Sequence, residues 1–173
     1  MPDTMPDTSP DTSSNTSNDG LADTLKAHSG SDVAVPDLSR LPAPIPALID
    51  LLGACVMCDR LARDAELVEF CNAAQLLARE VYPEMILARW ELRVWFHANG
   101  ERLRELAGDE RRLGALLEAV EDSELRQIAL GALYAVTVCD YHTADEEARL
   151  LRLACRAWAP ARLTSNAMAA LDL

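Results

Sequence analysis

The chain has 173 residues, half of them hydrophobic, and a formal net charge of -12. This length and apolar content predict a single globular domain with one core. An acidic chain repels phosphate backbones, which argues against direct nucleic-acid binding. No apolar run reaches the roughly 20 residues that cross a bilayer, and the N-terminus lacks signal-peptide features, so we expect no membrane span and a cytoplasmic location.

The first 42 residues have the composition of a disordered acidic tail. They open with the near-identical units MPDT, MPDT and SPDT, and continue rich in Ser, Thr, Asn, Asp and Gly. Such a segment cannot bury enough apolar surface to offset the entropy lost on ordering. We therefore expect a helical domain over residues 43–163, followed by a short C-terminal tail over residues 164–173.

Apolar residues spaced by three and four positions predict six or seven short helices in this domain. In chain order, the expected helices cover Pro46 to about Cys58, Leu67–Val81, Pro83 to Asn99-Gly100, about 101–107, Asp109–Val120, Asp122 or Ser123 to Val136, and Thr143 to just before Pro160. Asn99-Gly100 is typical of a C-terminal cap, and Thr143-Ala-Asp-Glu146 is typical of a capping box. No stretch alternates with the period of a strand, so the expected fold is all-α, a compact helical bundle.

Two segments of the chain match each other at an offset of 81 residues. Residues 47–74 and 128–155 are identical at seven of 28 positions, and four of the matches lie at the expected hairpin turns. These four are Cys58/Cys139, Asp59/Asp140, Asp64/Asp145 and Glu66/Glu147. We interpret the match as a duplicated helical hairpin and predict that the two copies pack about a pseudo-twofold axis, because mutual burial covers both apolar faces.

Each of the two turns gathers carboxylates. They are Asp59, Asp64 and Glu66 in the first turn, and Asp140, Asp145, Glu146 and Glu147 in the second. Carboxylate oxygens suit calcium or magnesium, so these seven residues are the candidate ligands of a divalent cation. Acidic residues also stabilise helix starts without metal, by capping and through the helix dipole, and this alternative stays open. Arg60 and Arg63 oppose a cation at the first turn, which favours the second.

The two turns resemble those of the TerB family of tellurite-resistance proteins and its TerB-like relatives. The shared motif is an apolar helix, an Asp, a turn, and a capped acidic helix start with Glu seven residues after the Asp. It occurs here as Asp59 with Glu66 and as Asp140 with Glu147, within roughly residues 45–160. The family usually has Gly directly after the Asp, where this chain has Arg60 and Tyr141. The resemblance implies an all-helical fold, acidic clusters that bind divalent cations, and a non-enzymatic role in a bacterial stress response.

The five cysteines lie along apolar helical stretches, which favours free buried thiols over disulfides. Cys55 and Cys58 form a CxxC, but no second paired motif accompanies them, so a core role is favoured over a zinc or thiol-redox site. Phosphate loops, nucleophile elbows and zinc-protease motifs are missing from the sequence, which argues against an enzyme. Two functions stay open: a TerB-like cation-binding stress protein, or a metal-free interaction module that binds a protein partner or self-associates.

Overall fold

The computed structural model describes residues 34–58, 62–140 and 144–158 of the chain. The chain divides into the units Met1–Ala34 and Val35–Leu173, and every described helix belongs to the second unit. These elements are the 3-10 helix η1 (Leu38–Arg40) and the helices α2 (Ile45–Val56), α3 (Asp64–Val81), α4 (Arg89–Ala107), α5 (Glu110–Glu118), α6 (Ser123–Val138) and α7 (Asp145–Trp158). None of the described residues forms a strand, which confirms the all-α prediction.

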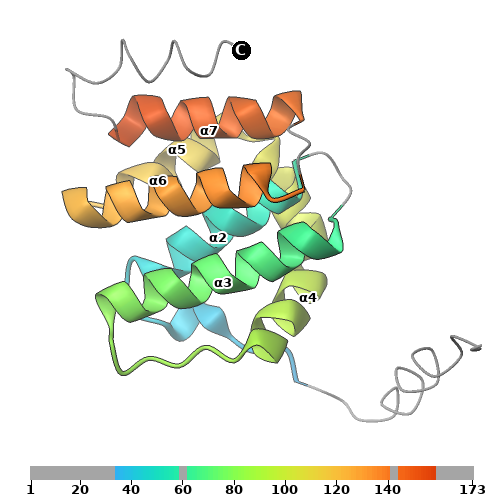
Figure 1. Cartoon of the computed structure of the whole chain (residues 1–173), viewed down its shortest axis with the longest axis vertical. Helices are drawn as coiled ribbons and strands as arrows, with labels where there is room; N and C mark the ends of the chain where they lie inside the picture. The colour runs from blue at the N-terminus through green and yellow to red at the C-terminus, as the bar shows by residue number, and fades with distance from the viewer. Residues whose placement is uncertain (1–33, 59–61, 141–143, 159–173) are drawn as a thin grey trace, which may run out of the picture. The chain divides into compact units, whose positions relative to one another are not determined.

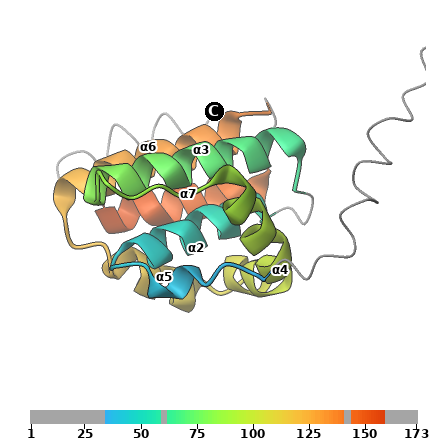
Figure 2. The same ribbon diagram turned by 90° about the horizontal axis from the view of Figure 1, so that it is seen from below.

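Helix α2 is the centre of the bundle. It packs against each of the other five α-helices, and Figure 2 shows α3 and α6 on one side of it and α4 and α5 on the other. Its sequence IPALIDLLGACV is apolar nearly all round, and nine of its twelve residues are buried. A helix that is hydrophobic on every side is stable in water only when other helices surround it, so this sequence determines the central position of α2.

The helices form two hairpins, α2–α3 and α6–α7, and α3 lies beside α6 (Figure 1). The end of α2, the start of α3, the end of α6 and the start of α7 therefore meet at one end of the bundle. The start of α2, the end of α3 and the start of α6 meet at the opposite end. Both predicted hairpins are present, while their pseudo-twofold relation stays a prediction.

Helix α4 differs from the prediction at both ends. The expected stop at Asn99-Gly100 is wrong, because α4 continues to Ala107 and no glycine among the described residues has a positive φ. The Asn99 amide instead donates to the Trp95 carbonyl within the helix, at 2.8 Å. Leu103 and Leu106 are buried further along, so burial of this apolar face outweighs the local capping signal.

The expected start of this helix at Pro83 is also wrong. Residues 82–88 precede α4 in a non-helical conformation. Gln75 Nε2 of α3 donates to the Leu87 carbonyl at 2.6 Å, and the Ala88 N–H donates to Glu91 Oε2 at 3.1 Å. The second of these bonds caps the helix start, so α4 begins at Arg89.

The packed domain begins before the boundary expected at residue 43. Leu38 of η1 is buried, and η1 packs against α2. The greater part of the predicted N-terminal tail, residues 1–33, and the predicted C-terminal tail over 164–173 lie outside the described residues. Of the described helices, none combines the length and the apolar character needed to cross a bilayer.

Candidate functional site

The seven predicted cation ligands do not share one environment. Asp64, Asp145 and Glu146 are exposed in the first turns of α3 and α7. Asp59 lies outside the described residues. The remaining three are Glu66, Glu147 and Asp140, which are buried or nearly buried where the two turns meet. Among the described members of the predicted set, these three carboxylates are therefore the ones withdrawn from solvent.

Glu66 and Glu147 occupy corresponding positions at their helix starts. Each has only 1% of its surface exposed. Glu66 Oε2 accepts a hydrogen bond from the Arg63 N–H at 2.8 Å, and Glu147 Oε2 accepts one from the Ala144 N–H at 2.9 Å. The two bonds are separated by 81 residues, the offset of the sequence repeat. Both carboxylates thus satisfy backbone donors that a helix start leaves without an intrahelical partner.

The capping prediction for α7 placed the wrong glutamate at the cap. Helix α7 begins at Asp145, so its third residue is Glu147 and not Glu146. Glu147 shares the inward face of the helix with Leu150, Leu151 and Ala154, whereas Glu146 is exposed. The apolar stripe fixes the rotation of the helix and turns Glu147 toward the core. Thr143, the expected cap residue, lies outside the described residues.

An ion pair joins the two turns. The guanidinium Nη1 of Arg63, just before α3, donates to Oδ2 of Asp140, just after α6. The Asp140 side chain is only 9% exposed, and that of Arg63 is 38% exposed. From the sequence we expected the charge of Arg63 beside the first turn, but its guanidinium contacts Asp140 of the second turn. The preference for the second turn as the cation site therefore loses one of its reasons.

Carboxylates of both hairpins act on the thiol of Cys139, at the end of α6. Burial raises the pKa of Cys139 to about 11, with the negative charges of Glu66, Asp140 and Glu69 acting in the same direction. The thiol donates to the Val136 carbonyl at 3.1 Å. Glu69 was missed by sequence reasoning, although it follows Glu66 by one helical turn. We call Arg63, Glu66, Asp140, Glu147 and Cys139 the junction.

Cys55 of α2 lies against the same cluster. Its side chain is fully buried, and its sulfur is 3.4 Å from the hydroxyl oxygen of Thr137. Burial raises the pKa of Cys55 to about 12, and the charges of Glu147 and Glu66 add to this effect. A thiol-redox site needs a reactive thiolate near neutral pH. Cys55 holds its proton there, which is the behaviour of a core cysteine.

The described residues do not complete a metal centre. Within residues 34–58, 62–140 and 144–158, no three His, Cys, Asp or Glu side chains are placed to hold one metal ion. Glu66 and Glu147 cap helices, and Asp140 pairs with Arg63. The arrangement can stabilise the fold without metal, and it brings carboxylates of both turns close enough to influence the same thiol.

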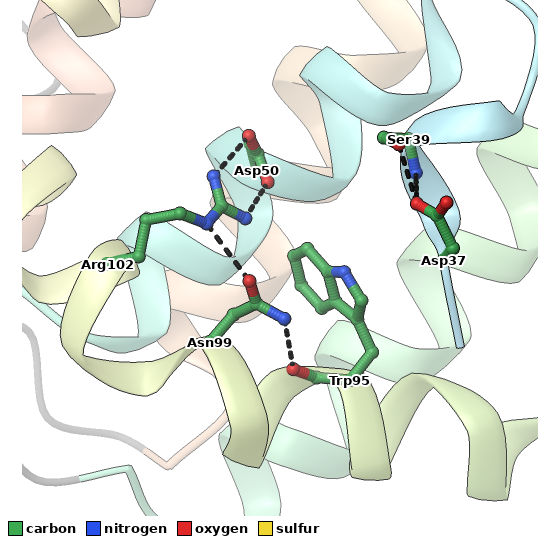
Figure 3. Close-up of polar contacts among 6 residues, drawn as sticks. All are labelled: Asp37, Ser39, Asp50, Trp95, Asn99 and Arg102. Carbon is green, nitrogen blue, oxygen red and sulfur yellow. Dashed lines mark hydrogen bonds and ion pairs between the residues drawn. The ribbon is translucent and has the colours of Figure 1, made fainter. Parts of the chain in front are cut away.

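A second polar cluster joins α2 to α4 and was not expected from the sequence (Figure 3). The guanidinium of Arg102 donates to both carboxylate oxygens of Asp50, at 2.7 and 2.8 Å, and to Asn99 Oδ1 at 3.1 Å. It also lies over the Trp95 ring, 5.5 Å from the centroid. The hydrogen bonds to Asp50 raise the pKa of Arg102. Asp50 is the only charged residue of α2, and that is the signal that could have predicted such a partner.

An open groove with a volume of about 700 Å³ lies at the end of the bundle opposite the junction. Its apolar lining includes Val81 at the end of α3, and Leu125 and Ile128 of α6. Four exposed carboxylates also line it, those of Glu80, Glu121, Asp122 and Glu124. Sequence reasoning missed this groove because its acidic residues come from segments about 40 residues apart.

Neither the family models, nor the curated proteins, nor the solved structures gave a match to this chain. The TerB resemblance therefore rests on the motif in the two turns.

Proposed function

We propose that this chain is a non-enzymatic, TerB-like helical protein in which a divalent cation binds at the junction. One observation carries the proposal: Arg63 donates its N–H to Glu66 of the first hairpin and its guanidinium to Asp140 of the second, so a single residue contacts a carboxylate of each hairpin. Calcium and magnesium prefer carboxylate oxygens, so the carboxylates that the two hairpins bring to Arg63 are the candidate ligands. The role in a stress response follows from the resemblance to TerB.

The physical basis of the proposal is the repulsion between carboxylates in a poorly solvated place. Several negative charges near one another at a buried position favour a bound cation or a protonated form. Arg63 already supplies one positive charge to Asp140. A cation would compete with Arg63 for this carboxylate, so binding would change how the start of α3 is joined to the end of α6. Such a change is what a cation-responsive protein requires.

Thermal melting during titration with calcium or magnesium tests the proposal. We expect the Tm to rise with occupancy, since a ligand that binds only the folded state stabilises it by about 2.7 kcal/mol at 100 times its Kd. Asp140→Asn should abolish the rise. Asp145→Asn removes the same charge from an exposed position and should retain it. Arg63→Gln should lower the cation concentration needed, because it removes the competitor.

Two results would end the cation proposal. One is an unchanged Tm of the wild-type chain up to about 10 mM cation, a concentration that saturates all but the weakest protein sites. The other is an equal response in Asp140→Asn and Asp145→Asn, which would show that the cation acts on the net charge and not on the junction.

A second function, that of an interaction module that binds a protein without metal, is favoured by a separate observation. The groove opposite the junction is open and is lined by apolar side chains together with four exposed carboxylates. Under this function, neither chelator nor Asp140→Asn changes partner binding. Native mass spectrometry with and without chelator separates the two functions, because it reports bound metal and self-association in one spectrum.

A further inference from the structure

We propose that the groove between the start of α2, the end of α3 and the start of α6 binds a basic amphipathic segment of a partner protein. The inference rests on the interaction-module function and identifies the partner by its chemistry. It does not depend on a cation at the junction, which lies at the other end of the same helices.

The lining of the groove defines the apolar half of this partner. Val81, Leu125 and Ile128 come from the end of α3 and the start of α6, and they are buried or half-buried. A volume of about 700 Å³ lies in the range of pockets that hold a ligand of several side chains. Segments that dock in such grooves place a few apolar anchor residues inside and leave their polar residues at the edge.

The four carboxylates that line the groove define the charged half of the partner. They are Glu80, Glu121, Asp122 and Glu124, and no basic side chain lines the groove within the part of the chain that the structure describes. Asp122 caps α6 by accepting from the Leu125 N–H, and all four side chains are exposed to solvent. Acidic side chains at a binding surface attract Lys and Arg, which speeds encounter and fixes the orientation of the partner.

The alternative occupants fit the groove less well. Arg126 of α6 does not fill the groove with its own positive charge, because its guanidinium donates to the Val120 carbonyl at 2.6 Å. The chain's own residues 159–173 contain one Arg and one Asp, so they carry no excess of positive charge. A small polyamine matches the carboxylates but has no side chains for the apolar lining. A basic segment with apolar residues satisfies both halves of the groove.

Fluorescence anisotropy with a designed probe tests the inference on the full chain. The probe is a labelled peptide of about 12 residues, with Leu at the spacing of one helical face and Lys elsewhere. We expect a Kd on the order of 10 to 100 µM at low salt, weakening as salt is added. A Lys-only peptide of equal charge and spermidine should each bind at least about ten times more weakly, because neither supplies apolar anchors.

A pair of charge variants locates the probe. Glu121→Gln combined with Glu124→Gln should weaken binding by roughly ten-fold, as expected for two exposed ion pairs. Glu105→Gln combined with Glu146→Gln changes the net charge equally at exposed positions outside the groove and should weaken binding less than about two-fold. Ile128→Ser should weaken binding further, whereas Tyr134→Ser, on an exposed position of the same helix, should not.

Several outcomes overturn the inference. One is that the Leu-Lys peptide does not bind. Another is that the Lys-only peptide or spermidine binds as tightly as the Leu-Lys peptide. A third is that the two pairs of charge variants weaken binding of the Leu-Lys peptide equally. Repeating the titration with chelator separates this inference from the cation proposal. If Asp140→Asn removes the cation response and the peptide still binds, the two sites are independent. If the chain does not bind the peptide but still responds to the cation, this inference is wrong and the cation proposal is unaffected.

Discussion

The two ends of the bundle, at opposite ends of α2, α3 and α6, are both acidic, but their carboxylates are used in different ways. At the junction, Glu66 and Glu147 are buried, cap helix starts and lie near two thiols of raised pKa. At the groove, Glu121 and Glu124 are exposed beside an apolar lining. The burial of a carboxylate, more than the number of carboxylates in a stretch of sequence, therefore decides whether it stabilises the fold or remains available to a partner.

This difference has a physical cause. A buried carboxylate loses its water and is tolerated only where hydrogen bonds or positive charges replace it, so its contacts contribute to stability. An exposed carboxylate keeps its water, contributes little to stability and retains its charge for an approaching ligand. The two ends should therefore respond differently to mutation: the junction in its free energy of unfolding, and the groove in its binding.

The largest effect is expected at the buried caps. Glu66→Ala removes the acceptor of the Arg63 N–H and leaves a cavity, so we expect a loss of about 2 to 3 kcal/mol in the free energy of unfolding. The control is Asp64→Ala, which removes an exposed carboxylate from the same helical turn and should cost less than about 1 kcal/mol. Urea unfolding followed by circular dichroism measures both. Equal losses would show that burial does not separate the two roles.

The second largest effect is expected at alkaline pH, where deprotonation of the Cys55 thiol beside the junction should lower the free energy of unfolding. The pKa of Cys55 is raised from 9.0 to about 12 in the folded chain, so the unfolded chain loses its proton first as the pH rises. The contribution of the protonated thiol to the free energy of unfolding is therefore fully present below pH 9 and is lost progressively toward pH 12. At pH 10.5 the loss is on the order of 2 kcal/mol. Urea unfolding of the wild type and of Cys55→Ala at about pH 8 and about pH 10.5 checks this. The variant should show a smaller decrease between the two pH values, and an identical decrease would contradict the assignment.

A smaller effect is expected from two glycines that differ in their surroundings. A Cβ on Gly53 of α2 would lie 2.9 Å from a methyl carbon of the buried Leu103, whereas a Cβ on Gly131 of α6 would meet nothing within 4 Å. Gly131→Ala should stabilise the chain by about 0.5 to 1 kcal/mol, because alanine is the better helix former. Gly53→Ala should gain nothing or lose about 1 kcal/mol, since the extra methyl group overpacks the core. Thermal melting compares them, and an equal gain at both positions would show that Leu103 moves aside freely.

The smallest effect on stability is expected at the groove. Glu121→Gln combined with Glu124→Gln should change the free energy of unfolding by less than about 0.5 kcal/mol, because both side chains are exposed. The same double variant is the one expected to weaken binding of the Leu-Lys peptide. Chemical unfolding measured beside the anisotropy titration checks both statements on one sample. A large loss of stability would mean that the carboxylates of the groove contribute to the fold as those of the junction do.

Most of the helices could be predicted from the sequence, because their apolar stripes are long and regular. Helices α3, α6 and α7 follow their stripes closely, and the wholly apolar faces of α2 required burial. The prediction of a helix end at Asn99-Gly100 was wrong because this local capping signal competes with the burial of Leu103 and Leu106, and Leu103 packs against Gly53 of α2. Local signals specify helix ends only where tertiary packing does not oppose them.

The candidate site was predictable in its residue types but not in its geometry. The offset of 81 identified Glu66 and Glu147 as corresponding positions, and both prove to be buried caps. The pairing of Arg63 with Asp140 links residues 77 positions apart, and no local pattern encodes it. Grouping carboxylates by sequence proximity therefore joined Asp140 to the exposed Asp145, whereas in the structure it faces the other hairpin.

The most direct test of whether the two turns form one junction is a double-mutant cycle on Arg63 and Asp140. Arg63→Gln, Asp140→Asn and the combined variant are compared by urea unfolding, with Arg63→Gln and Asp145→Asn as the control cycle. We expect a coupling free energy of about 1 to 3 kcal/mol between Arg63 and Asp140 and less than about 0.5 kcal/mol in the control. Additive losses in both cycles would contradict the joined turns and remove the basis for a shared cation site.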